Sequence, residues 1–209
     1  MSADGQGGAP EGAGGVWRRW RERIARARAG RDAAHGLYLQ LVELARRPAL
    51  YVEGGVPDTN DGRLEMVGLH VALAARHLAK LGDSGRQLAQ RLVELMFADI
   101  DRNLRELGVG DLSVGRKVKD IAGSFRGRAA ALEAGLSQGD REALATMLLR
   151  NLYLTGTPPN ERQVLAVVDH LLWLDARIGA ADAGALLAGR LRLEGAAEGE
   201  GVDPPPPPS

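Results

Sequence analysis

The chain has 209 residues, of which 44% are hydrophobic and only 4% aromatic, and its 27 basic side chains balance 27 acidic ones. It is long enough to bury a core, and its zero net charge gives no general reason to expect DNA binding. It contains no cysteine, which excludes disulfides, thiolate metal sites and cysteine nucleophiles, and it has no apolar run of the roughly 18 residues that a membrane-spanning helix needs.

The N-terminal part of the chain divides into a Gly/Ala-rich tail, residues 1–15, and a basic amphipathic arm helix, residues 16–31. The tail is too poor in apolar residues to offset the entropy of folding, so we expect it to be disordered. The arm holds seven arginines against one glutamate, and Trp17 and Trp20 share one helical face with Ile24. Such a helix suits an anionic membrane surface, because indole rings favour the interface and each arginine adds about 1 kcal/mol of attraction.

Three interpretations of this arm remain open. It contacts a membrane or a partner, or its tryptophans pack against the rest of the protein, or it is an Arg-rich organellar targeting peptide. Under the first interpretation, the membrane-surface residues are Trp17, Arg18, Trp20, Arg21, Ile24 and Arg28.

Residues 35–193 are predicted to form one helical domain. Apolar residues recur at spacings of three and four, which puts each set on one side of a helix, and no segment has the pattern of a strand. The predicted fold is therefore all-α, a single compact bundle of about seven helices. The acidic, Pro-rich residues 194–209 form a second tail that we expect to be disordered. The predicted helices span 36–47, 64–81, 88–107, 118–136, 141–154, 161–178 and 183–193.

Residues at the predicted helix ends fit this reading. Glycines 82, 108 and 179 follow helices, where a left-handed cap favours glycine. Asp140 is predicted to cap the helix that follows it, and Asp111 or Ser113 the helix before.

The helix over 118–136 and the residues just before it carry a basic cluster. Arg116, Lys119 and Arg126 share a face, and Gly123 and Gly127 lie beside it. Missing side chains at positions i and i+4 let another backbone approach closely. This surface is either a docking groove for a partner segment, or a solvated basic face with two glycines at an internal helix crossing. The candidate partner-binding residues are Arg116, Lys119, Gly123, Arg126, Gly127 and Arg128.

Paired carboxylates at Asp99 and Asp101 could hold Mg²⁺ in an all-α enzyme acting on a diphosphate substrate. Residues two apart point about 200° away from each other on a helix, so the two cannot easily share one ion. Arg102 and Arg105 stand three and four residues further on, where we expect them to form ion pairs with these carboxylates.

The four histidines do not form a metal-binding pattern. His70 and His77 face the same way but lie about 10 Å apart along a helix, and His35 and His170 could approach each other only through tertiary packing. No dinucleotide fingerprint, P-loop or serine nucleophile motif is present. The sequence therefore predicts no catalytic residue, no metal and no cofactor.

Short motifs between residues 45 and 128 resemble, in their order and separations, those of the ubiquinol–cytochrome c chaperone family. The resemblance covers about residues 37–154 and continues more weakly through 191. Two positions depart from the family's pattern: Arg126 stands where an aromatic residue is expected, and Leu50 where the family favours phenylalanine. The matching motifs are ARRPALY at 45–51, GVPDT at 55–59, DGR at 61–63, LH at 69–70, FADID at 97–101, LRELGVGDL at 104–112, VGRKVK at 114–119 and FRGR at 125–128.

The resemblance implies a non-enzymatic, all-helical assembly factor for the respiratory ubiquinol–cytochrome c reductase. It implies cytochrome b or its assembly intermediate as the client, an anionic membrane surface beside it, and a small partner protein or the ribosome as further partners. A bacterial member would work peripherally at the cytoplasmic face of the inner membrane, and a eukaryotic one at the mitochondrial matrix side. The rival readings are the magnesium-dependent enzyme and a generic membrane-surface scaffold.

Overall fold

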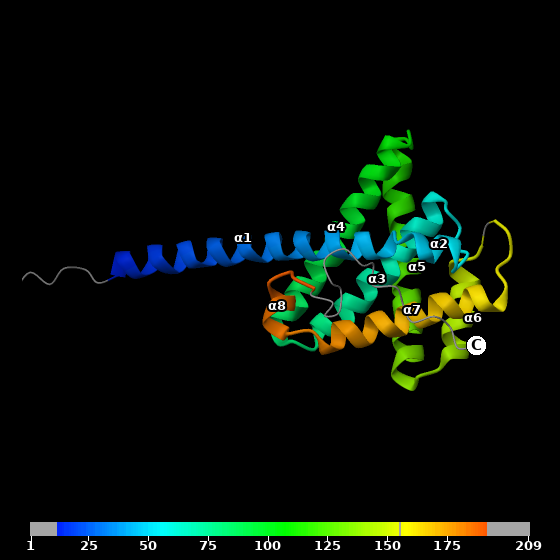
Figure 1. The fold of residues 1–209 in the computed structure, drawn as a ribbon. Helices are drawn as coiled ribbons and strands as arrows, with labels where there is room; N and C mark the ends of the chain where they lie inside the picture. Colours follow the sequence, from blue (N-terminus) through cyan, green and yellow to red (C-terminus); the bar gives the residue numbers. More distant parts are fainter. Residues whose placement is uncertain (1–11, 155, 192–209) are drawn as a thin grey trace, which may run out of the picture.

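A computed structural model describes residues 12–154 and 156–191, and within these ranges the chain forms eight helices and no strand (Figure 1). The all-α prediction is confirmed. Residues 1–11 of the predicted N-terminal tail and all of the acidic tail lie outside the described residues. The helices are α1 (Gly12–Ala45), α2 (Pro48–Val52), α3 (Asn60–Ala79), α4 (Gly82–Glu106), α5 (Asp111–Gln138), α6 (Arg141–Asn151), α7 (Glu161–Ala180) and α8 (Ala183–Leu187).

Helix α1 is continuous where the sequence predicted two helices, at 16–31 and 36–47. No proline interrupts this stretch, and single glycines at 30 and 36 each cost a helix only about 1 kcal/mol relative to alanine. Burial nevertheless changes along it, because no described side chain from Trp17 to Asp32 is buried and Ala33 begins the buried part. The helix is about 50 Å long, and its N-terminal half projects beyond the other helices (Figure 1).

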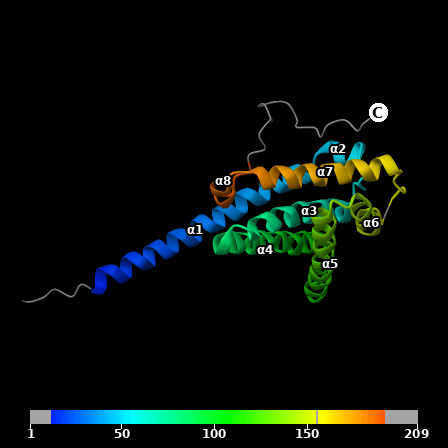
Figure 2. The ribbon, with the colours of Figure 1, turned by 90° about the horizontal axis from the view of Figure 1, so that it is seen from below.

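The core lies where the C-terminal half of α1 crosses α3 and α4. Figure 2 shows α3 and α4 side by side, with α5 crossing both of them at a steep angle. Helix α7 packs against α3 and α6, so the cluster of buried apolar side chains is continuous through the bundle. Its largest fully buried members include Leu37 and Leu41 of α1, Leu73 and Leu78 of α3, Leu92 and Met96 of α4, and Leu171 and Leu174 of α7.

Several helix ends follow the sequence prediction, and others do not. Asp140 caps α6 by accepting a hydrogen bond from the Ala143 amide at 2.9 Å, as predicted. The predicted caps of α5 are wrong, because Gly110 occupies the N-cap position and Asp111 is already the first helical residue. Gly179 does not end α7, which continues through Ala180.

The C-terminal predicted helix is also shorter than expected. Helix α8 covers only Ala183–Leu187 of the predicted 183–193, because Gly189 takes a left-handed φ of +74° and turns the chain. A short helix that the sequence did not predict, α2, begins at Pro48, which is suited to a first helical position.

Helices α4 and α5 form a hairpin whose end stands clear of the bundle (Figure 1). The turn is made at Gly108, which has a φ of +78° in the left-handed region, as the sequence predicted for a residue after a helix end. This projecting hairpin presents the C-terminal turns of α4 and the N-terminal turns of α5 for contact from more than one side.

Candidate functional site on the projecting hairpin

The basic face predicted on α5 is open to solvent. Arg116, Lys119 and Arg126 are all exposed. A Cβ atom added at Gly123 or Gly127 would meet nothing within 4 Å, so neither glycine lies at a helix crossing within the described residues. The internal-crossing interpretation is therefore wrong, and no other part of the described chain covers the three cations or the backbone at the two glycines.

Arg128 belongs to a different environment. Its Nε lies 2.7 Å from a carboxylate oxygen of Glu65 on α3, and the two side chains are only 14% and 17% exposed. Burial raises the pKa of Glu65 to about 7, and the nearby Arg128 guanidinium opposes that shift. Arg128 thus ties α5 to α3, and it is separated from the exposed cations of the basic face.

A cleft lies on the other side of α5, between the hairpin and helices α1 and α3. Its volume is about 390 Å³, and its wall is mixed, with apolar side chains beside ionic ones. Leu107 at the hairpin end is 62% exposed although it continues the apolar stripe of α4. The one sign of this cleft in the sequence is that the apolar stripe of α4 continues beyond its last buried residue, Ile100, to Leu107. The apolar lining residues are Val42, Leu64, Val67, Ile100, Leu104, Leu107 and Ile121.

The two carboxylates considered for magnesium form ion pairs, as predicted. Arg105 donates to Asp101 at 2.7 Å, and Arg102 lies 4.0 Å from Asp99. Tyr38 also donates its hydroxyl to Asp99 at 3.0 Å, and burial together with this carboxylate raises the pKa of Tyr38. Within the described part of the chain no three acidic or histidine side chains gather in a way that could hold a metal ion.

Two histidines meet in the core, which the sequence did not predict because they are 100 residues apart. The Nε2 atoms of His70 and His170 lie 3.0 Å apart, and both side chains are buried. His70 Nδ1 lies 2.8 Å from the Met66 carbonyl and must donate to it, so His70 Nε2 accepts and His170 Nε2 donates. Burial lowers the pKa of both imidazoles, which keeps the pair neutral.

The arm tryptophans do not pack against the bundle. Trp17 and Trp20 are 61% and 53% exposed, and their rings contact each other edge to face at 5.7 Å. Ile24, one turn further on, is half-buried. No helix in the described ranges is long and apolar enough to span a bilayer.

Comparison with known proteins places these features in a family. A model of the ubiquinol-cytochrome C chaperone family matches residues 52–193. The chain belongs to this family. The match covers the basic face and most of the cleft, and it begins after the arm. The resemblance inferred from the sequence motifs is therefore confirmed, and membership supports a role as an assembly factor.

A solved structure extends the similarity to most of the chain. The crystal structure of the Cbp3 homolog from Brucella abortus matches with a TM-score of 0.73 and 30% sequence identity, covering 85% of this chain and 96% of that chain. No curated protein matches the chain significantly. The bundle described above is thus a fold of the chaperone family.

Proposed function

We propose that this chaperone-family protein holds cytochrome b, or an assembly intermediate containing it, beside an anionic membrane surface until the ubiquinol–cytochrome c reductase matures. The observation that carries the proposal is the open basic face on α5, where Arg116, Lys119 and Arg126 surround the uncovered backbone of Gly123 and Gly127. Among the residues that the structure describes, this face takes no part in the protein's own packing.

The chemistry of the hairpin suits a helical, partly apolar client. Glycines at i and i+4 let a second helix approach closely, and the surrounding cations can pair with carboxylates at its ends. The cleft on the opposite side of α5 offers apolar contacts through Leu104, Leu107 and Ile121, none of which is fully buried. A client segment that wraps around the hairpin would use both surfaces.

The arm supplies the proposed membrane contact. Trp17 and Trp20 are exposed on the projecting half of α1, and Arg18, Arg21 and Arg28 on the same half are exposed as well. Indole rings at the headgroup level and arginines beside anionic lipids both favour binding to the membrane surface. The proposed location is therefore peripheral, at the cytoplasmic face of a bacterial inner membrane.

The test of client binding is a triple variant, R116A/K119A/R126A, that removes three exposed cations without touching the core. We expect co-purified cytochrome b to fall about ten-fold, since three exposed ion pairs are together worth about 1.4 kcal/mol or more. The matched control is R150A/R162A/R190A, which removes three exposed cations from other surfaces. Equal recovery of cytochrome b with both variants would remove the basic face from the proposal.

A second experiment separates a chaperone from a generic membrane scaffold. Both predict that W17A/W20A lowers binding to phosphatidylglycerol vesicles by about ten-fold or more, because two large aromatic surfaces are lost from the interface. Only the chaperone predicts that cytochrome b is recovered with the protein from native membranes. Vesicle binding without recovery of cytochrome b would favour the scaffold.

A further inference from the structure

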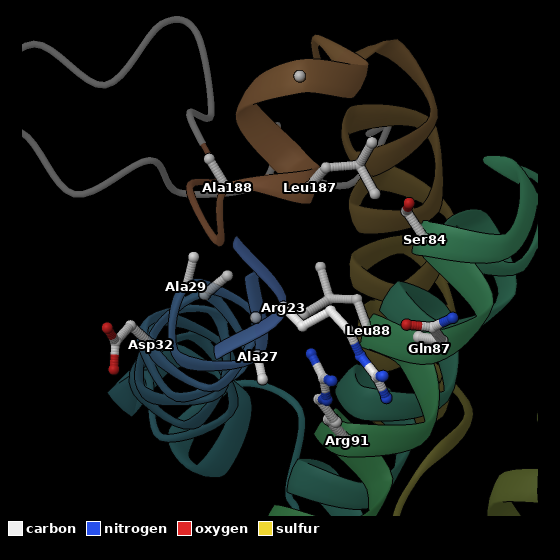
Figure 3. Close-up of a pocket in the computed structure, with 13 residues that line it drawn as sticks. Arg23, Ala27, Ala29, Asp32, Ser84, Gln87, Leu88, Arg91, Leu187 and Ala188 are labelled. Carbon is white, nitrogen blue, oxygen red and sulfur yellow. The ribbon is translucent and has the colours of Figure 1, made fainter. Parts of the chain in front are cut away.

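A hollow of about 1170 Å³ lies between α1, α4 and α8, on the side of the molecule away from the projecting hairpin. Figure 3 shows that the guanidinium groups of Arg23 on α1 and Arg91 on α4 both end in the space between these helices. Asp32, the acidic residue in the lining, points away from them (Figure 3). Leu88 and Leu187 supply apolar surface beside the two cations.

Gly30 of α1 leaves room for the end of the Arg91 side chain. A Cβ atom at Gly30 would lie only 1.8 Å from a terminal nitrogen of Arg91, so the guanidinium rests where α1 has no side chain. No carboxylate of the described residues forms an ion pair with Arg91 or Arg23. Two guanidinium groups that converge without a counterion make a site for an anionic group, because a carboxylate between them would relieve their repulsion.

The end of the described chain is held close to this hollow. Ala188 lines it, and the segment that follows is anchored to α1 by Gln40, whose Nε2 donates to the Gly189 carbonyl at 2.8 Å and whose Oε1 accepts from the Leu191 amide at 2.9 Å. The backbone of Gly189 also contacts Ala33 of α1. The chain therefore continues beyond Leu191 from a fixed point on α1.

The residues that follow have the complementary charge. Residues 194–203 contain four carboxylates and no basic side chain, opposite an arm with seven arginines. In extended form, the three to twelve residues between Leu191 and these carboxylates reach about 10 to 40 Å. Gly30 and Arg23 lie about 15 and 26 Å from Gln40 along α1, so the acidic segment is long enough to reach both cations.

We propose that the acidic segment 194–203 of the same chain docks in this hollow and pairs its carboxylates with Arg23 and Arg91. Because the segment is tethered, its effective concentration at the hollow is high, and weak ion pairs suffice to hold it. Docking covers the base of the basic arm and reduces the positive charge that the arm offers to other anions. This inference depends on the hollow and its charges alone, independently of the proposed client.

The absence of native cysteine allows a direct test in the full-length chain. In a S84C/A197C variant, one thiol lies at the rim of the hollow and the other within the acidic segment. We expect fast intramolecular crosslinking by a short bismaleimide at low salt. The rate should fall about ten-fold when R23Q/R91Q is added, because two ion pairs are lost. It should fall similarly in 0.5 M NaCl, where the charges are screened.

Two further variants make the result decisive. E194Q/E198Q/E200Q/D203N changes no described residue, so it cannot act by unfolding the bundle, and it should slow crosslinking as much as R23Q/R91Q does. R116Q/K119Q removes two cations from α5 and should leave the rate unchanged. Equal rates in all variants would mean that the tether alone brings the thiols together, and the proposal would be overturned.

Vesicles of phosphatidylglycerol distinguish a lipid occupant. If the acidic segment docks, the variant with neutralised carboxylates should bind vesicles several-fold more tightly than the wild type, because the arm is uncovered. If crosslinking is slow in the wild type while R23Q/R91Q weakens vesicle binding, the hollow takes a lipid headgroup and the proposal is wrong. Docking without any vesicle binding would refute the proposed membrane role of the arm and leave the docking intact.

Discussion

The buried imidazole pair makes the stability of this protein dependent on pH in a way that one double substitution should remove. His70 and His170 share a hydrogen bond in the core and are held neutral by burial. Replacing both in H70L/H170L removes the donor and the acceptor together, so no buried polar group is left without a partner. Replacing only His70 would leave the His170 N–H unpaired, at a cost of about 1–3 kcal/mol.

The magnitude follows from the pKa values. Burial lowers the pKa of His70 from 6.5 to about 4, and that of His170 further. The unfolded chain therefore binds protons at both sites below pH 6.5 while the folded chain does not, so stability is complete above pH 6.5 and is lost as pH falls toward the folded-state values. At pH 5, each histidine favours the unfolded state by about 2 kcal/mol, or about 4 kcal/mol for the pair.

The assay is urea unfolding followed by far-ultraviolet circular dichroism at pH 8, 6.5 and 5, for the wild type and H70L/H170L. Other groups titrate as well, and the raised pKa of Glu65 acts in the opposite direction, since its stabilising protonated form is present at low pH. The difference between the two proteins isolates the imidazoles. That difference should change by about 4 kcal/mol between pH 8 and pH 5 in favour of the variant, and parallel profiles would refute a neutral buried pair.

Three further substitutions test the packing and the hairpin. G189A should lower the free energy of unfolding in urea by more than about 2 kcal/mol. Gly189 has a φ of +74°, and a Cβ there would lie 2.1 Å from the Ala33 carbonyl oxygen. A loss below about 0.5 kcal/mol would contradict this close approach. R128A should lower stability by about 2–3 kcal/mol, because it removes a mostly buried side chain and its bond to Glu65, whereas K119A should change it by less than about 0.5 kcal/mol. Equal melting temperatures would disprove the distinction. L107D should reduce recovery of cytochrome b several-fold with an unchanged melting temperature, since Leu107 is exposed at the hairpin end; full recovery would remove the cleft from the client surface.

The helices could be predicted because their signal is local. Leu92, Met96 and Ile100, chosen from their spacing alone, are all buried on one side of α4. The exposed cations of α5 were also predictable, since the spacing of Arg116, Lys119 and Arg126 fixes their common face. A period of 3.6 residues thus decides both what is buried and what faces solvent on a single helix.

The contacts between helices could not be predicted, because no local pattern in the sequence shows which helices pack against each other. The pairing of His70 with His170 requires α3 and α7 to pack together, and the inward position of Arg128 requires Glu65 on α3. The continuity of α1 was missed for a different reason. The change in composition near residue 31 coincides with the start of burial at Ala33, and a helix can pass from solvent into a core without interruption.

Because the backbone of α1 is uninterrupted, the direction in which Trp17 and Trp20 point around the helix axis is fixed relative to the bundle. Inserting one alanine after Arg31 would rotate Trp17 and Trp20 by about 100° and turn them away from whatever plane they meet. Inserting seven residues would return them to within about 20° of their original direction while moving them about 10 Å outward. The angle and the height of the bundle above that plane can therefore be varied separately.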